Sequence, residues 1–131
     1  MTRYSGSCHC GAVTFAIEAE IDHLTACDCS LCVKKNARMA RVREADLTVL
    51  SGQGQLGAYE WNTHRARHHF CRICGIHVFH RKRADPGLYE VNVFCLDGFD
   101  PSGLPVWASE GVGMSVVAQG AREVWPGPRE G

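Results

Sequence analysis

Seven of the eight cysteines in this 131-residue chain stand in three short clusters, and their spacing constrains the fold more than any other feature. The clusters are Cys8-x-Cys10, Cys27-x-Cys29-x-x-Cys32 and Cys71-x-x-Cys74, and Cys95 stands apart. The first residues, MTRYSGSCHCG, lack the apolar stretch of a secretory signal, so we expect a cytoplasmic protein. Because the cytosol keeps thiols reduced, the clusters indicate metal binding or catalysis before disulfides.

The spacing within the clusters suits thiolate ligands of a metal ion. In CRICG the chain must turn sharply between Cys71 and Cys74, and Gly75 can supply the positive φ that closes such a turn. Side chains two positions apart on a strand share one face, so each C-x-C pair can hold one ion. On such a strand His9 would point to the opposite face, which argues against a role as a ligand.

The seven clustered thiols divide as four plus three. A closed structural zinc site takes four ligands, whereas a catalytic site keeps one position open. One division forms a closed site from the first and third clusters, Cys8, Cys10, Cys71 and Cys74. It leaves the middle cluster as a three-thiolate site with a vacancy, formed by Cys27, Cys29 and Cys32. The spacing leaves two alternatives open: the middle C-x-C could pair with the third cluster instead, or Cys95 or a histidine could close the second site. We expect Cys95 to be a core thiol.

Short alternating apolar segments predict an all-β fold of short antiparallel strands with at most one short helix. Residues 13–17 are typical of a half-buried strand, and residues 47–52 and 56–61 predict a hairpin around Gly52-Gln53-Gly54. We expect one domain over residues 1–131.

Two further strands are predicted at residues 76–81 and 88–94, joined through the turn Asp85-Pro86-Gly87. His77 and His80 stand three apart in the first of them and are therefore expected on opposite faces, which weakens any role as paired ligands.

The one helix is predicted from Ser30, a candidate N-cap, to about Ala37. Lys34 and Lys35 on it could offset the negative charge of the cysteines, but we expect them to be solvated. The tail from about residue 125, rich in proline and glycine, is expected to be loosely held.

The charge balance bears on the partners. Fourteen basic and fourteen acidic residues leave the chain formally neutral, which argues against sequence-independent binding of nucleic acid. Residues 62–83 nevertheless hold five arginines, one lysine and five histidines without an acid. This segment is either a solvated surface or a binding surface for an anion, which could be the carboxylate of a small substrate or the phosphate backbone of a nucleic acid. No apolar run reaches membrane-spanning length, so no membrane partner is expected.

Four segments, GSCHCGAVTF, CDCSLC, HFCRICGIHVF and VNVFCLDG, resemble in this order the glutathione-dependent formaldehyde-activating enzyme (GFA) family, also called the centromere-protein-V-like family. The resemblance spans roughly residues 5–98 and implies a zinc-binding all-β fold of the β-tent type with two zinc ions. It matches the structural zinc ligands of the family to Cys8, Cys10, Cys71 and Cys74. It matches the catalytic zinc ligands to Cys27, Cys29 and Cys32. It also implies carbon–sulfur lyase chemistry of the kind that adds glutathione to formaldehyde.

A zinc ion held by three thiolates is a poor activator of water, and its soft ligand set suits a sulfur ligand. We therefore predict a zinc-dependent carbon–sulfur lyase-like enzyme that acts on thiol adducts of small aldehydes, with glutathione or a related thiol as its partner. Arg65, Arg67 and Arg72 could meet the carboxylates of such a substrate. The alternative is a non-catalytic two-zinc module that contacts nucleic acid or protein through residues 62–83.

Overall fold

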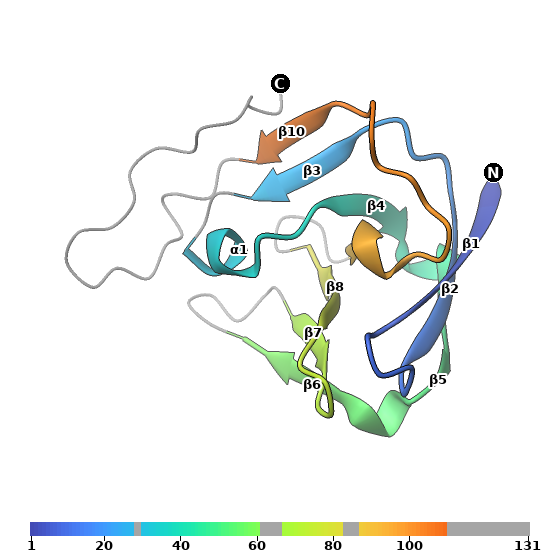
Figure 1. Cartoon of the computed structure of the whole chain (residues 1–131), viewed down its shortest axis with the longest axis vertical. Coiled ribbons are helices and arrows are strands. Elements are labelled where there is room, and N and C mark those ends of the chain that lie inside the picture. The colour runs from blue at the N-terminus through green and yellow to red at the C-terminus, as the bar shows by residue number, and fades with distance from the viewer. Residues whose placement is uncertain (28–29, 61–66, 83–86, 110–131) are drawn as a thin grey trace.

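Two β-sheets carry most of the regular structure in the computed structural model, which describes residues 1–27, 30–60, 67–82 and 87–109 (Figure 1). A three-stranded sheet has the order β1-β2-β5, and a seven-stranded sheet has the order β10-β3-β4-β9-β8-β7-β6. The first consists of β1 (Thr2–Ser7), β2 (Thr14–Ala19) and β5 (Leu47–Ser51). The second consists of β3 (Leu24–Cys27), β4 (Met39–Arg43), β6 (Leu56–Tyr59), β7 (His68–Cys71), β8 (His77–Arg81), β9 (Leu88–Asn92) and β10 (Val106–Ser109).

The prediction of an all-β fold with at most one short helix is confirmed. Within the described ranges the helix is α1 (Ser30–Lys35), and three short 3-10 turns follow strands, η1 (Glu44–Asp46), η2 (Gln53–Gln55) and η3 (Val93–Cys95). Paired strands in the described part run antiparallel, with the exception of β10, which lies parallel to β3. Among the described residues, no helix combines the length and apolar character that crossing a membrane requires.

The hydrophobic core joins the two sheets. Phe15 and Ile17 of β2 are almost fully buried, and the Phe15 ring meets Phe79 of β8 edge to face, with centroids 6.2 Å apart. Tyr89 of β9 packs against the same Phe79 ring at 5.7 Å. Since removing a buried phenylalanine ring costs about 3–5 kcal/mol, the contact of Phe15 with Phe79 is a principal tie between the sheets, and Tyr89 supports Phe79 from within the larger sheet.

The predicted hairpin over residues 47–61 is wrong, although both of its strands exist. β5 pairs with β2, whereas β6 pairs with β7 at the edge of the larger sheet. Gly52 adopts φ 82° between them, and a Cβ at this position would collide with the backbone carbonyl of Ala12. The close approach of the two backbones redirects the chain from one sheet into the other, so the turn is not a hairpin turn.

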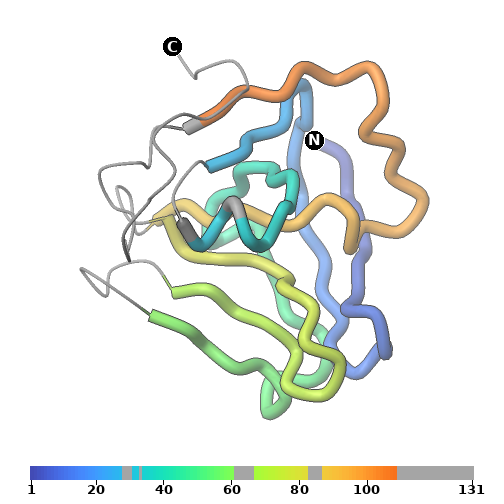
Figure 2. Tube along the Cα trace, turned by 60° about the vertical axis from the view of Figure 1, so that its left-hand side comes forward, coloured from blue at the N-terminus to red at the C-terminus, as the bar shows by residue number. Residues whose placement is uncertain are grey.

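Helix α1 is shorter than the predicted span, which reached Ala37. Asn36 adopts φ 52°, a left-handed conformation that asparagine tolerates better than most residues, and its N–H donates to the carbonyl oxygen of Cys32 at 3.0 Å. Helix α1 lies between β3 and the strands β7 and β8 in both views of the chain (Figures 1 and 2).

Strands β8 and β9 pair antiparallel, so the two strands predicted at residues 76–81 and 88–94 are confirmed. Asp85 and Pro86 of the connecting turn lie outside the described residues, as does the tail. One irregularity in β8 changes which side chains share a face. Phe70 of β7 pairs with His77 and its neighbour His69 pairs with Phe79, so Val78 is an extra residue, a β-bulge.

Candidate metal centre and buried polar ladder

Two turns, one from each sheet, bring four cysteines together. Cys8 and Cys10 lie in the turn after β1, Cys71 ends β7, and Cys74 lies in the following turn. Their four sulfur atoms all lie within 4.8 Å of one another. The sulfur of Cys10 lies 3.6 Å from that of Cys8 and 3.7 Å from that of Cys71. The structure thus groups the first and third clusters, one of the arrangements that the spacing allowed.

The first pair does not lie on a strand, contrary to our expectation. The N–H of Cys8 donates to the carbonyl of Val13 at 3.0 Å, and the N–H of Gly11 donates to the carbonyl of Cys8 at 3.3 Å. Gly11 adopts φ 80°. The sulfurs of Cys8 and Cys10 therefore converge because the chain turns around them. Strand alternation does not determine where His9 points, so it gives no reason to exclude His9 as a ligand.

The second pair lies in the sharp turn that CRICG predicts. The N–H of Gly75 donates to the carbonyl of Cys71 at 2.8 Å, and the N–H of Cys71 donates to the carbonyl of Ile76 at 3.0 Å. Gly75 adopts φ 79°, so the expected positive φ is confirmed. The turn folds the backbone around the Cys71 sulfur, which also accepts the N–H of Ile73 at 3.4 Å.

The geometry of the four sulfurs fits a zinc ion. Zinc–sulfur bonds of about 2.3 Å in a tetrahedron place sulfur atoms about 3.8 Å apart. The separations from Cys10 to Cys8 and to Cys71, 3.6 and 3.7 Å, match this edge length. The N–H of Val13 donates to the Cys8 sulfur at 3.4 Å, as backbone donors commonly do to thiolate ligands. The cysteine cluster can therefore hold a metal ion.

The acidities of the thiols differ within the cluster. The backbone N–H of Ile76 lowers the pKa of Cys74 to about 6. Although the N–H of Ala12 lowers the pKa of Cys10, burial and the neighbouring cysteines outweigh it and raise that pKa to about 11. Four thiolates so close together repel one another, and a divalent cation between them removes this repulsion.

Cys95 is a core thiol, as predicted, although it lies in η3 rather than in a strand. Its sulfur donates to the carbonyl oxygen of His77 at 3.7 Å. Burial, together with the charges of Cys8 and Cys74, raises its pKa to about 11, which keeps it a neutral thiol at physiological pH. It is not part of the four-cysteine group.

The middle cluster lies in a different place, at the junction of β3 and α1. Cys27 is the last residue of β3 and Cys32 lies within α1, while Cys29 between them is outside the described residues. Both described cysteines are half-buried. Cys27 stands two positions after Thr25 and therefore shares its face of the strand.

That face carries a row of polar side chains across four neighbouring strands, which we name the polar ladder: Arg41 of β4, Glu90 of β9, His80 of β8 and His68 of β7. Each member is the register partner of the next. Glu90 is only 4% exposed, and one of its oxygens accepts from Nε2 of His80 at 3.0 Å. The other accepts from Oγ1 of Thr25 at 3.0 Å and lies 3.4 Å from Nε of Arg41.

These donors compensate for burying the carboxylate. Burial raises the pKa of Glu90, but the hydrogen bond from His80, the positive charges nearby and the Thr25 hydroxyl outweigh it and hold the pKa at about 2. The Thr25 contact joins the ladder to β3, the strand that carries Cys27.

Lys35 covers the other end of the ladder. Its Nζ lies 3.2 Å from Nδ1 of His68 and 3.2 Å from Nε2 of His77. An ammonium group can only donate, so both ring nitrogens accept, and the ring protons sit on Nε2 of His68 and Nδ1 of His77. Burial, and next the charge of Lys35, lower the pKa of His77 far below its ordinary value, consistent with a neutral ring.

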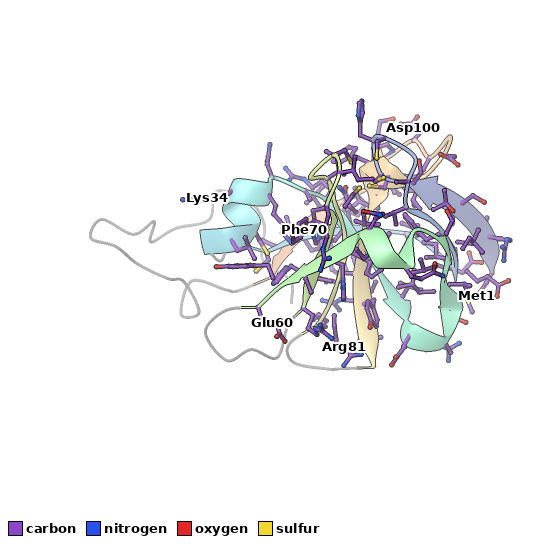
Figure 3. All side chains as sticks on the ribbon, turned by 90° about the horizontal axis from the view of Figure 1, so that it is seen from below. Met1, Lys34, Glu60, Phe70, Arg81 and Asp100 are labelled. Carbon is purple, nitrogen blue, oxygen red and sulfur yellow. The ribbon has the colours of Figure 1, made fainter. Side chains whose placement is uncertain are left out.

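Two expectations are corrected here. His77 and His80 do not lie on opposite faces: the bulge at Val78 shifts the alternation, and their ring centroids are 5.8 Å apart. Lys35 is half-buried and hydrogen-bonded, not solvated. Lys34, by contrast, is exposed and points away from the sheets (Figure 3).

Residues 3–108 match the family model described as glutathione-dependent formaldehyde-activating enzyme. The chain belongs to the GFA family. A solved structure supports the same fold: the crystal structure of a Rhodobacter sphaeroides protein superposes with a TM-score of 0.73. The two chains are 39% identical, and the match covers 78% of this chain and 98% of the other.

In this GFA-family chain, the basic segment 62–83 divides into two parts. Arg67 and Arg72 are exposed, and Nε of Arg67 lies 3.6 Å from a carboxylate oxygen of Glu60; Arg65 lies outside the described residues. The histidines His68 and His80 point inward instead and are more than nine-tenths buried. The described part of the segment therefore does not present a continuous positive surface.

The ladder is the feature of this GFA-family chain that sequence reasoning missed. Strand alternation alone would have separated His77 from His80, since a bulge leaves no clear mark in the sequence. One signal was available. Glu90 stands between Tyr89 and Val91 in a mainly apolar strand, where an acid needs buried partners.

Proposed function

We propose that this protein is a zinc-dependent carbon–sulfur lyase-like enzyme that acts on thiol adducts of small aldehydes, of the S-hydroxymethylglutathione type. Its membership of a family described as glutathione-dependent and formaldehyde-activating supports the substrate class. In this proposal one zinc ion is structural and a second is catalytic.

The observation that carries the proposal is the separation of the two cysteine groups. Four sulfurs complete one tetrahedral set without the middle cluster. Cys27 and Cys32, with Cys29 between them in the sequence, are therefore left as a separate group. Cys27 shares the face of β3 on which Thr25 contacts the polar ladder, and Cys32 lies on α1.

The first site would be held by Cys8, Cys10, Cys71 and Cys74, with no position left for a substrate. It would join the turn after β1 to the turn after β7 and thus stabilise the fold. Its role is structural.

The second site would be held by Cys27, Cys29 and Cys32. Zinc bound there would keep one position open and lower the pKa of an incoming thiol, so that it loses its proton at neutral pH. The chain itself contributes a half-buried setting for Cys27 and Cys32, at the junction of β3 and α1.

The reaction forms one carbon–sulfur bond and converts the carbonyl double bond to a single bond. The substrate sulfur attacks the carbonyl carbon of a small aldehyde, a carbon–sulfur bond forms, and the π electrons move to oxygen, which takes up a proton. In the lyase direction the hydroxyl of the adduct loses its proton and the carbon–sulfur bond breaks. A donor beside the oxygen stabilises its developing charge in either direction.

Calorimetric titration of the zinc-loaded protein tests the proposal. Glutathione is expected to bind, whereas S-methylglutathione, which lacks the thiol, is expected not to bind at the same concentrations. Cys32→Ser should abolish the glutathione signal. Salt-sensitive binding of a short DNA duplex, without a response to either thiol, would instead favour the two-zinc binding module.

A further inference from the structure

Lys35 is held more firmly than a surface lysine of a short helix. Two of its three N–H donors go to His68 and His77, at 3.2 Å each, and no acceptor among the described residues takes the third. The two histidines come from adjacent strands, β7 and β8, so the position of the ammonium group is fixed by the larger sheet.

The polar ladder keeps His68 in place. Its ring lies 4.8 Å, centroid to centroid, from that of His80, and His80 is hydrogen-bonded to the buried carboxylate of Glu90. Buried side chains in such a network have little rotational freedom. A group held on this network is preorganised, which is the property that electrostatic catalysis requires.

Lys35 is also a helical neighbour of Cys32, one of the middle cysteine cluster. It follows Cys32 by three positions on α1, and residues three apart on a helix are neighbours on one face. Helix α1 contacts β3, which ends at Cys27. A substrate sulfur bound among these cysteines would carry its reacting oxygen one carbon atom away.

We infer that Lys35, positioned by His68 and His77, donates a proton to the oxygen of the aldehyde as the carbon–sulfur bond forms. This inference rests on the proposed function and assigns a catalytic residue to it. The thiol has already released its proton to water. As the sulfur attacks, the π pair of the carbonyl moves to oxygen, which takes a proton from Nζ of Lys35. The neutral amine then regains a proton from water. In the lyase direction the same amine removes the hydroxyl proton.

Lys34 provides a matched control, because it is the adjacent lysine of the same helix and is exposed. The experiment measures, by two-dimensional exchange NMR, the exchange of glutathione and formaldehyde with their adduct in the presence of zinc-loaded protein. Lys34→Met should match the wild type within about twofold. Lys35→Met should lose about 100-fold in kcat, typical of a general acid, with KM for glutathione nearly unchanged. Lys35→Arg, which keeps the charge and the donors but cannot release its proton, should not recover the loss.

A second measurement does not depend on turnover. Nitrogen-15 NMR of the histidine rings in the zinc-loaded wild type should show the proton on Nε2 of His68 and on Nδ1 of His77. Other tautomers would mean that Lys35 is not held as described and would overturn the inference. If Lys35→Met does not fold, Lys35→Gln and Lys35→Arg carry the kinetic comparison.

The outcomes separate the two proposals. If the wild type accelerates the exchange and Lys35→Met equals Lys34→Met, the role of Lys35 is wrong and the proposed function stands. If Lys35→Met raises KM and leaves kcat unchanged, Lys35 binds a remote part of the substrate, and the inference is again overturned. If the wild type does not accelerate the exchange, the proposed function fails, and the inference fails with it.

Discussion

The sulfur of Cys10 lies 3.7 Å from that of Cys71, although 61 residues separate them in the chain. This contact joins the turn after the first strand of one sheet to the turn after a strand of the other. A metal ion at this point would therefore link the two sheets in addition to the hydrophobic core.

Cys71→Ser and Cys32→Ser should have opposite consequences. A structural zinc ion contributes about 10–16 kcal/mol in small zinc domains, which is as large as the whole stability of a typical domain. Cys71→Ser should therefore yield unfolded or insoluble protein. Cys32→Ser should remain folded and retain one zinc ion. Circular dichroism and metal analysis check both results. If the two variants collapse alike, both zinc ions are structural and the enzyme proposal is weakened.

Graded chelation should remove the two zinc ions in two steps. A site with an open position exchanges ligands more readily than a site closed by four thiolates. The first equivalent should leave without loss of near-ultraviolet circular dichroism, and the second should leave together with unfolding. Release of both ions in one step, with unfolding, would contradict the division of the cysteines.

Cys95→Ala should still bind two zinc ions. Its thiol is buried, stays protonated and donates to a backbone carbonyl, so it is not set up as a ligand. The measurement is zinc content after purification in excess metal. Loss of one ion would show that Cys95 closes the second site.

Glu90→Gln should reduce stability in a pH-dependent manner. The pKa of Glu90 is held at about 2 in the folded protein, below the ordinary value of 4.5, so its stabilising contribution is complete above pH 4.5 and disappears as the pH falls towards 2. Losing a charged hydrogen-bond acceptor costs about 2 kcal/mol. The difference in unfolding free energy between wild type and variant should therefore be largest near neutral pH and shrink below pH 4.5. Urea titrations at several pH values test this, and a difference independent of pH would refute it.

Gly52→Ala should be far more harmful than Gly103→Ala. Both glycines adopt φ 82°, so the backbone strain is the same in each variant, about 1–2 kcal/mol. At Gly52 the new methyl group would also collide with the backbone of Ala12, whereas at Gly103 nothing lies within 4 Å. The difference in Tm between the two variants measures the cost of the collision alone. Equal decreases in Tm would show that the turn can move away from Ala12.

Local patterns predicted β2, β5, β6, β8 and β9, the short helix and the positive φ of Gly75, because alternation and turn chemistry are properties of neighbouring residues. They did not predict the other five described strands. They failed where two distant segments meet. The hairpin at Gly52 is absent because the backbone of Ala12 lies against the turn. Nothing in the sequence of residues 47–61 indicates this contact.

In the candidate site, too, local features could be predicted and contacts between distant segments could not. Cysteine spacing indicated the turn at Cys71, yet the ladder from Arg41 to His68 depends on the order of four strands, and the approach of His77 to His80 depends on one bulge. Lys35 was misjudged because its partners are 33 and 42 residues away along the chain. The charges and spacing of the six residues of α1 do not indicate that His68 and His77 lie beside Lys35.

The distance along the chain between the two halves of the four-cysteine cluster also has a consequence for biosynthesis. At translation rates of about 5–20 residues per second, the 61 residues from Cys10 to Cys71 take about 3 to 12 s to synthesise. During that interval Cys8 and Cys10 have left the ribosome without the two sulfurs that complete their set. The N-terminal pair is thus exposed to oxidants and to competing metal ions for seconds in every round of synthesis, and the yield of active protein should depend on the thiol redox state and zinc supply of the cell that makes it.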